Sequence, residues 1–196
     1  MIAPSDIFDD FGTDLVNIYG LCEEIDFAQS LASNWYSEKM SGGASENSMY
    51  FGKGTPSELD ASYQYKRKFV DLYKNVQKDG PNAQSLRKMA IVNANALWEH
   101  KYRNSIGGCL NPPITNLPSK IFVDLNKYRQ AVLHVQGRLD KEIEVLKFCK
   151  KGEVLSLSKE QFHELFKMLV SELNSISKTY FFTNSQYSLD IYLNQI

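Results

Sequence analysis

The chain has 196 residues, of which 43% are hydrophobic and 12% aromatic, and its formal net charge is −1. This composition predicts one folded domain with an ordinary apolar core and excludes a disordered protein. Because the net charge is close to zero, any nucleic-acid site has to be a local basic patch. The apolar stretches are interrupted by charges and the N-terminus lacks a signal-peptide pattern, so we expect a cytoplasmic protein without a membrane segment.

The residue types that bind metals and cofactors form no recognisable pattern. The cysteines Cys22, Cys109 and Cys149 lie far apart, which predicts reduced thiols and neither a metal site nor a disulfide framework. The sequence contains no glycine-rich phosphate loop, no His-Glu-x-x-His motif and no nucleophile elbow. We therefore expect a protein that works without a cofactor and without a metal.

The first part of the chain predicts two helices separated by a loop. Apolar residues recur at three- and four-residue steps from Ile7 onward, which predicts a long amphipathic helix that reaches about residue 36. Residues 41–55 are rich in Gly, Ser and Asn and predict a flexible loop. Ser57 has the features of a helix N-cap, and the helix that follows is expected to stop at Gly80.

The second part predicts three long helices. The first covers residues 83–105 and ends at a pair of glycines, after which a proline-containing connector follows. The next begins near Ser119 and breaks at Gly137, and the last begins at Ser158 with a capping box.

Between the last two helices we expect a short helix over residues 140–148 and a short extended segment near residues 153–157. Together these patterns predict an all-α fold, a bundle of about four to six helices in a single domain of residues 1–196.

The stretch from Tyr128 to Gly137 points most directly to chemistry. Four residues separate Arg129 from His134, in an apolar helical run that stops at the glycine. Arginine offers a permanent charge and a fork of donors that suits phosphate, and histidine exchanges a proton near neutral pH. These two side chains form a minimal set for cleaving RNA without a metal, and the amide of Gln130 can support them by orienting the phosphate or the histidine.

Helix geometry sets a condition on this pair. At about 100° per residue, the five steps from Arg129 to His134 place the two side chains roughly 140° apart around a straight helix. They converge only if the helix loosens before Gly137 or if a second chain contributes to the site. Either route puts the chemistry at a helix end.

Residues 124–140 resemble the signature of HEPN domains, in which an arginine, a polar residue, three mostly apolar residues and a histidine precede a small glycine-containing loop. Residues 98–103 and 148–162 are similar to segments on either side of that signature in uncharacterised HEPN proteins. The resemblance is strongest over residues 83–173. This chain departs from the family pattern at Gln130, where Asn, Asp or His is usual.

The resemblance implies a helical bundle that forms a homodimer, with two motifs facing one cleft. It also implies a metal-independent endoribonuclease of a toxin–antitoxin or antiviral defence system, with RNA as substrate and an antitoxin or another defence protein as partner. In this reading Arg129 and His134 are catalytic and Gln130 supports them. Two alternatives stay open: a catalytically inactive HEPN-like module for dimerisation or partner binding, and a helical interaction domain with an accidental motif.

Other charged residues extend the predicted site. Basic residues close to the motif in sequence are expected to steer the RNA backbone toward it. They are Arg138, Lys147, Lys150 and Lys151.

The third predicted helix carries Glu99, His100 and Arg103. Glu99 and Arg103 are four residues apart, so the simplest interpretation is an exposed ion pair on the helix surface. The functional interpretation is that these residues line the cleft beside the motif.

A second basic run covers residues 66–68, and such runs are usually solvated helix faces. The chain is also rich in aromatic residues, among them Tyr63, Tyr65, Tyr73 and Tyr128. We expect most of them in the core, and any exposed member can stack on nucleic-acid bases.

Overall fold

The computed structural model describes residues 4–44, 47–53, 62–110, 112–115 and 117–181. The chain forms two compact units, a larger one of residues 1–23 and 85–196 and a smaller one of residues 24–84. Within the described residues no helix is long and apolar enough to cross a bilayer. The elements are mostly helical, which confirms the predicted all-α bundle with a short extended segment.

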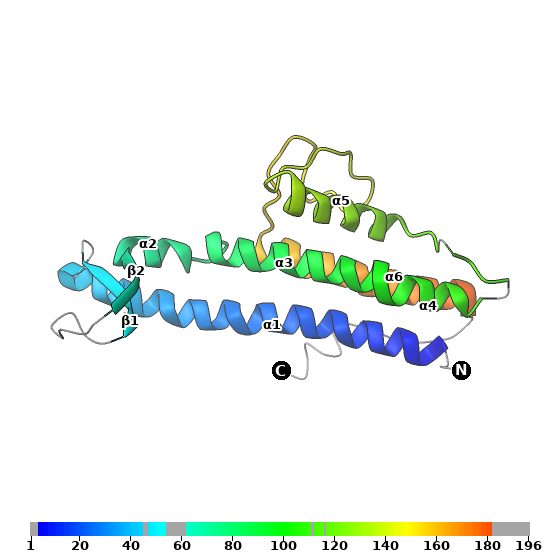
Figure 1. The fold of residues 1–196 in the computed structure, drawn as a ribbon, viewed down its shortest axis with the longest axis horizontal. Coiled ribbons are helices and arrows are strands. Elements are labelled where there is room, and N and C mark those ends of the chain that lie inside the picture. Colours follow the sequence, from blue (N-terminus) through cyan, green and yellow to red (C-terminus); the bar gives the residue numbers. More distant parts are fainter. Residues whose placement is uncertain (1–3, 45–46, 54–61, 111, 116, 182–196) are drawn as a thin grey trace. The chain divides into compact units, whose positions relative to one another are not determined.

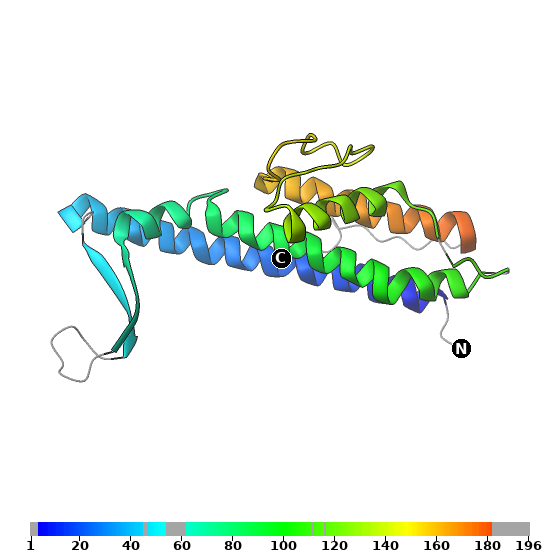
Figure 2. The same ribbon diagram turned by 45° about the horizontal axis from the view of Figure 1, so that its top comes forward.

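The larger unit is a bundle of helices that lie side by side in both ribbon views (Figures 1 and 2). Its helical elements are α1 (Pro4–Lys39) up to residue 23, α3 (Pro81–Leu97) from residue 85, η2 (Trp98–Tyr102), α4 (Arg103–Gly108), α5 (Lys120–His134) and α6 (Lys159–Phe181). The helix that begins as α3 is interrupted by a π-helical stretch, η2, in which backbone hydrogen bonds join residues five apart. The chain then continues as the short helix α4.

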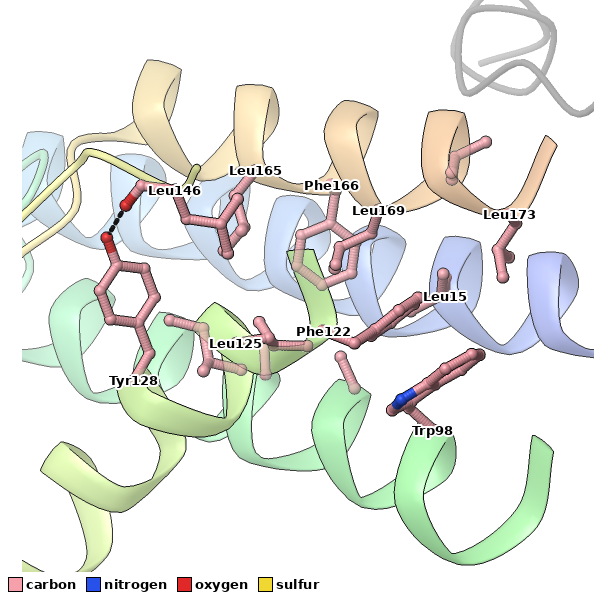
Figure 3. Close-up of a cluster of buried hydrophobic side chains, with 14 of the residues drawn as sticks. Leu15, Trp98, Phe122, Leu125, Tyr128, Leu146, Leu165, Phe166, Leu169 and Leu173 are labelled. Carbon is pink, nitrogen blue, oxygen red and sulfur yellow. Dashed lines mark hydrogen bonds between the residues drawn. The ribbon is translucent and has the colours of Figure 1, made fainter. Parts of the chain in front are cut away.

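The core of this unit is dense in aromatic and leucine side chains from all of its long helices (Figure 3). Trp98 stacks on Phe122 with ring centroids 4.0 Å apart, which joins η2 to α5. Phe11 of α1 stacks on Tyr102 at 4.4 Å. Each fully buried side chain of this size contributes about 1.5–3 kcal/mol, so this packing fixes the position of α5 in the bundle.

The helix starts in this unit follow the sequence. The Ser119 hydroxyl accepts a hydrogen bond from the Phe122 N–H at 3.3 Å and caps α5. Ser158 and Gln161 form the predicted capping box at the start of α6, with reciprocal bonds of 3.2 and 2.9 Å. The long N-terminal helix and the helix over residues 83–105 are also confirmed, the latter with its π-helical interruption.

The short helix predicted over residues 140–148 is wrong. This segment has no helical turns, because the N–H groups of Glu144, Val145 and Leu146 donate to the buried carboxylate of Asp124. Of the extended segment predicted near residues 153–157, Val154 forms an isolated antiparallel bridge with Arg138.

The smaller unit differs from the sequence prediction. It contains an antiparallel hairpin of β1 (Ser48–Lys53) and β2 (Ser62–Lys68), followed by α2 (Phe69–Asn75). The predicted loop is therefore wrong over β1, and the predicted helix is wrong over β2. Tyr63 and Tyr65 alternate with polar residues there, a period that suits a strand. The proposed N-cap Ser57 lies outside the described residues.

The cysteines are free in this structure. Cys22 and Cys149 are buried, whereas Cys109 is exposed. Burial raises the pKa of the Cys149 thiol, and the nearby Glu153 carboxylate adds to the effect.

Candidate functional site

Helix α5 positions the Arg129–His134 motif. Its buried face packs into the core through residues such as Leu125 and Tyr128, so the helix cannot rotate without emptying the core. His134 is the last residue of the helix and is exposed, and Arg129 is half-buried on its flank. The histidine is therefore accessible to a ligand at the end of the helix.

The helix remains regular up to His134 and ends sharply after it. Gln136 and Gly137 adopt left-handed conformations, with φ of 53° and 83°, and the Gly137 N–H donates to the Ala131 carbonyl at 2.8 Å. These two residues complete a helix cap of the kind that usually needs glycine. Because α5 does not loosen before its cap, Arg129 and His134 stay roughly 140° apart in one chain.

Backbone hydrogen bonds form a short ladder between residues 137–139, directly after α5, and residues 152–155. Leu139 N–H donates to the Glu153 carbonyl at 2.9 Å, and Leu155 N–H donates to the Gly137 carbonyl at 2.7 Å. The Arg138 guanidinium donates to the Gly152 carbonyl oxygen. The ladder therefore joins Arg138, directly after the cap of α5, to the segment that contains the exposed pair Lys150–Lys151.

Lys147 takes a different position. It is exposed and follows Leu146, whose carbonyl oxygen accepts a hydrogen bond from the Tyr128 hydroxyl (Figure 3). Tyr128 precedes His134 by six residues, about 9 Å along the helix. Burial raises the pKa of Tyr128 to about 12, so this hydroxyl stays protonated and acts as a structural donor.

Gln130 is held by a neighbouring cation. Its side-chain oxygen accepts a hydrogen bond from Lys141 Nζ at 2.6 Å. Gln130 and His134 are one helical turn apart and share a face of α5. The amide thus lies beside the histidine, with its acceptor oxygen already engaged.

Sequence reasoning missed Lys88 of α3. A Cβ atom built on Gly137 would lie 3.5 Å from Lys88 Nζ, which places this ammonium directly beside the cap of α5. Nothing in the sequence joins position 88 to the motif, because only the packing of α3 against the end of α5 brings them together. A cation of α3 therefore lies near the glycine that ends α5.

Glu99 and Arg103 lie at the opposite end of α5. They form an ion pair of 2.7 Å and line a cavity of about 630 Å³ together with the first turn of α5, including Ser119 and Ile121. His134 lies thirteen residues beyond Ile121, about 20 Å along the helix.

His100 is exposed and does not line this cavity. The structure therefore joins Glu99 and Arg103 in one cavity but does not bring them to the motif.

Asp124 connects α5 to the loop that precedes the ladder. One carboxylate oxygen accepts backbone N–H bonds of 2.6–3.1 Å from residues 144–146, and the other accepts from Lys127 at 2.8 Å. Burial opposes ionisation of this side chain, but the bonds from Lys127, Val145 and Leu146 outweigh it and lower its pKa. The buried carboxylate therefore stays charged and fixes the loop.

Comparison with family models, with curated proteins and with solved structures finds no match to this chain. In the described part of the chain, no three His, Cys, Asp or Glu side chains gather into a group that could hold a metal ion. His134 is exposed at the last position of α5, where its imidazole can exchange a proton with a ligand.

Proposed function

We propose that this chain is a metal-independent endoribonuclease of the HEPN type that acts as a homodimer. The observation that carries the proposal is the position of His134, which is exposed as the last residue of α5, three residues before the Gly137 cap that lies near Lys88 Nζ and is followed by Arg138. Fixed cations around a proton-transferring group are what cleavage of a polyanion requires. RNA is the substrate because its 2′-hydroxyl supplies the nucleophile.

The reaction begins when a base removes the 2′-hydroxyl proton and the 2′-oxygen attacks the adjacent phosphorus. The bond to the 5′-oxygen then breaks, and an acid protonates the leaving oxygen. His134 serves as base or acid, and Arg129 stabilises the charge that develops on the phosphorane. The products are a 2′,3′-cyclic phosphate and a 5′-hydroxyl.

The homodimer follows from helix geometry. In one chain Arg129 and His134 project about 140° apart, so a single α5 cannot place both on one phosphate. Two copies related by a twofold axis can pair the arginine of one with the histidine of the other. Each of the two sites so formed then contains one His134, which serves as base or acid, and the Arg129 of the other chain.

The decisive test is cleavage of a labelled mixed-sequence RNA by purified protein in EDTA. We expect wild-type protein to cleave, and both His134→Ala and Arg129→Ala to lose about 100-fold or more of the rate. His100→Ala, which removes an exposed histidine outside the site, is the matched control and should cleave normally. Equal cleavage by all four proteins, or none by the wild type, contradicts the proposal.

One observation favours a second candidate, a catalytically inactive HEPN-like module that dimerises or binds a partner. Because Lys141 engages the Gln130 oxygen, that oxygen is not free to accept an N–H from the His134 imidazole, which weakens the part of Gln130 in orienting the histidine. A dimer in analytical ultracentrifugation with no cleavage of any RNA would favour this candidate. For either function we propose a cytoplasmic role in a toxin–antitoxin or defence system, with an antitoxin or another defence protein as partner.

A further inference from the structure

The β1–β2 hairpin of the smaller unit is unusually basic for a chain with a net charge of −1. Neither described strand contains an Asp or a Glu. The connecting segment 54–61, which contains two acidic residues, lies outside the described residues. The cations of the strands are Lys53, Lys66, Arg67 and Lys68.

Cations and aromatic rings alternate on both faces of this hairpin. On one face Tyr50 lies opposite Lys66, whose Nζ is 5.1 Å from the centre of the tyrosine ring. On the other face Phe51 lies opposite Tyr65, with ring centroids 5.5 Å apart, and Arg67 lies 5.1 Å from the Tyr65 ring. Each face therefore combines positive charge with a planar apolar surface.

These aromatic rings are open to solvent. Tyr50, Phe51 and Tyr65 are 41%, 39% and 44% exposed. A two-stranded hairpin has little stability by itself. The exposed aromatic rings on its two faces do not form a core that would stabilise it. An exposed cluster of this kind is typical of a binding surface.

We propose that this hairpin binds single-stranded nucleic acid. Lys66, Arg67 and Lys68 contact the phosphates, and unstacked bases pack on the exposed rings of Phe51 and Tyr65, a combination that tolerates many sequences. The charge pattern decides between this ligand and an anionic membrane. An element that lies on a membrane separates an apolar face from a basic face, whereas here both faces carry both kinds of residue.

The proposal rests on the hairpin alone and does not depend on the cleavage chemistry. Its test uses full-length protein and a fluorescent single strand with 2′-O-methyl groups, which cannot be cleaved by 2′-hydroxyl attack. Fluorescence anisotropy gives the affinity at several salt concentrations. Binding of this strand without cleavage of ordinary RNA would overturn the proposed nuclease and leave the hairpin proposal standing. Cleavage of ordinary RNA without binding of this strand would overturn the hairpin proposal and leave the nuclease standing.

The charge variant is Lys66→Gln combined with Arg67→Gln and Lys68→Gln. Loss of three phosphate contacts is expected to reduce the slope of log affinity against log salt by about 2, since each contact to a single strand contributes about 0.7. The control replaces lysines outside the hairpin, in α2 and α6, by glutamine and should change the slope by less than about 0.5. The lysines of this control are Lys74, Lys167 and Lys178.

The ring variant, Phe51→Ala with Tyr65→Ala, is expected to weaken binding roughly 10-fold or more without changing the salt slope, because stacking is not an ionic contact. Lys66→Arg with Lys68→Arg keeps the charge and should bind like the wild type, which shows that the strand tolerates substitution there. The proposal is overturned if the charge variant behaves like its control, if duplex binds more tightly than single strand, or if these substitutions release the protein from phosphatidylserine vesicles but not from the oligonucleotide.

Discussion

At the scale of single residues, Asp124 fixes the loop of residues 144–146 against α5. Its carboxylate is fully buried and accepts bonds from three consecutive backbone N–H groups and from Lys127. A buried charge is tolerated only when it is paired in this way. The carboxylate thereby replaces the hydrogen bonds that a helix over residues 144–146 would have made.

We predict that Asp124→Asn lowers the free energy of unfolding at pH 7 by about 2–4 kcal/mol, because it removes the charge and weakens a network of hydrogen bonds. Urea unfolding measures the difference. The exposed Asp140→Asn is the matched control and should stay within about 0.5 kcal/mol of the wild type. Equal stability of the two variants would contradict the role assigned to the buried carboxylate.

The same network predicts the direction of a pH effect. Because the pKa of Asp124 is lowered in the folded chain, its contribution to stability is present above the ordinary value of 3.8 and is lost as the pH falls through the folded value. The stability difference between wild type and Asp124→Asn should therefore shrink below about pH 4. Thermal unfolding at pH 7 and at pH 3 tests this. A difference that is independent of pH would show that charge is not its cause.

At the scale of elements, the end of α5 depends on backbone conformation. Gly137 has a φ of 83°, a region that costs residues with a Cβ atom about 1–2 kcal/mol. Gly137→Ala should lower the unfolding free energy by about that amount, whereas Gly108→Ala, with open space around it and no positive φ, should have little effect. If the two variants unfold at the same urea concentration, the helix end is not strained.

The start of α6 supports a second prediction about an element. Ser158→Ala removes the hydroxyl that accepts the Gln161 N–H, and we expect a loss of about 1 kcal/mol. Ser156→Ala, at an exposed position in the preceding extended segment, should be close to neutral. Midpoints of urea unfolding provide the comparison, and a neutral Ser158→Ala would show that the capping box adds no stability.

The elements that the sequence predicted correctly are those whose signals are local. The period of α1 and the caps Ser119 and Ser158 can be read within a few residues. The hairpin was missed because β1 pairs with β2 across the intervening segment and neither face is apolar. The loop over residues 140–148 was missed because the acceptor of its N–H groups, Asp124, lies about twenty residues earlier.

The residues of the candidate site likewise fall into those that local sequence signals predicted and those that only tertiary packing places. His134 and its helix end were predicted from the motif and from Gly137, which share one stretch of sequence. Lys88 was not, because only tertiary packing places α3 beside the cap. The position of Glu99 and Arg103, about 20 Å along α5 from the histidine, also depends on packing and could not be read from spacing.

At the scale of the whole molecule, the proposed site is shared between two chains, and subunit mixing tests this. If the arginine of one copy works with the histidine of the other, a mixture of Arg129→Ala and His134→Ala chains contains dimers with one intact site. Random exchange should then restore about a quarter of the wild-type rate, because half of the dimers are mixed and each has one of two sites. A mixture as inactive as its components would contradict a shared site.

The exposure of Cys109 gives the chain a natural position for a probe. The other two thiols are buried, and Cys149 is further protected by its raised pKa, so the thiolate that reacts with maleimide is scarce there. Intact-mass spectrometry after brief treatment at pH 7 should therefore show a single adduct. A nitroxide attached to Cys109 would then report by dipolar spectroscopy whether two chains associate, without any change to the sequence.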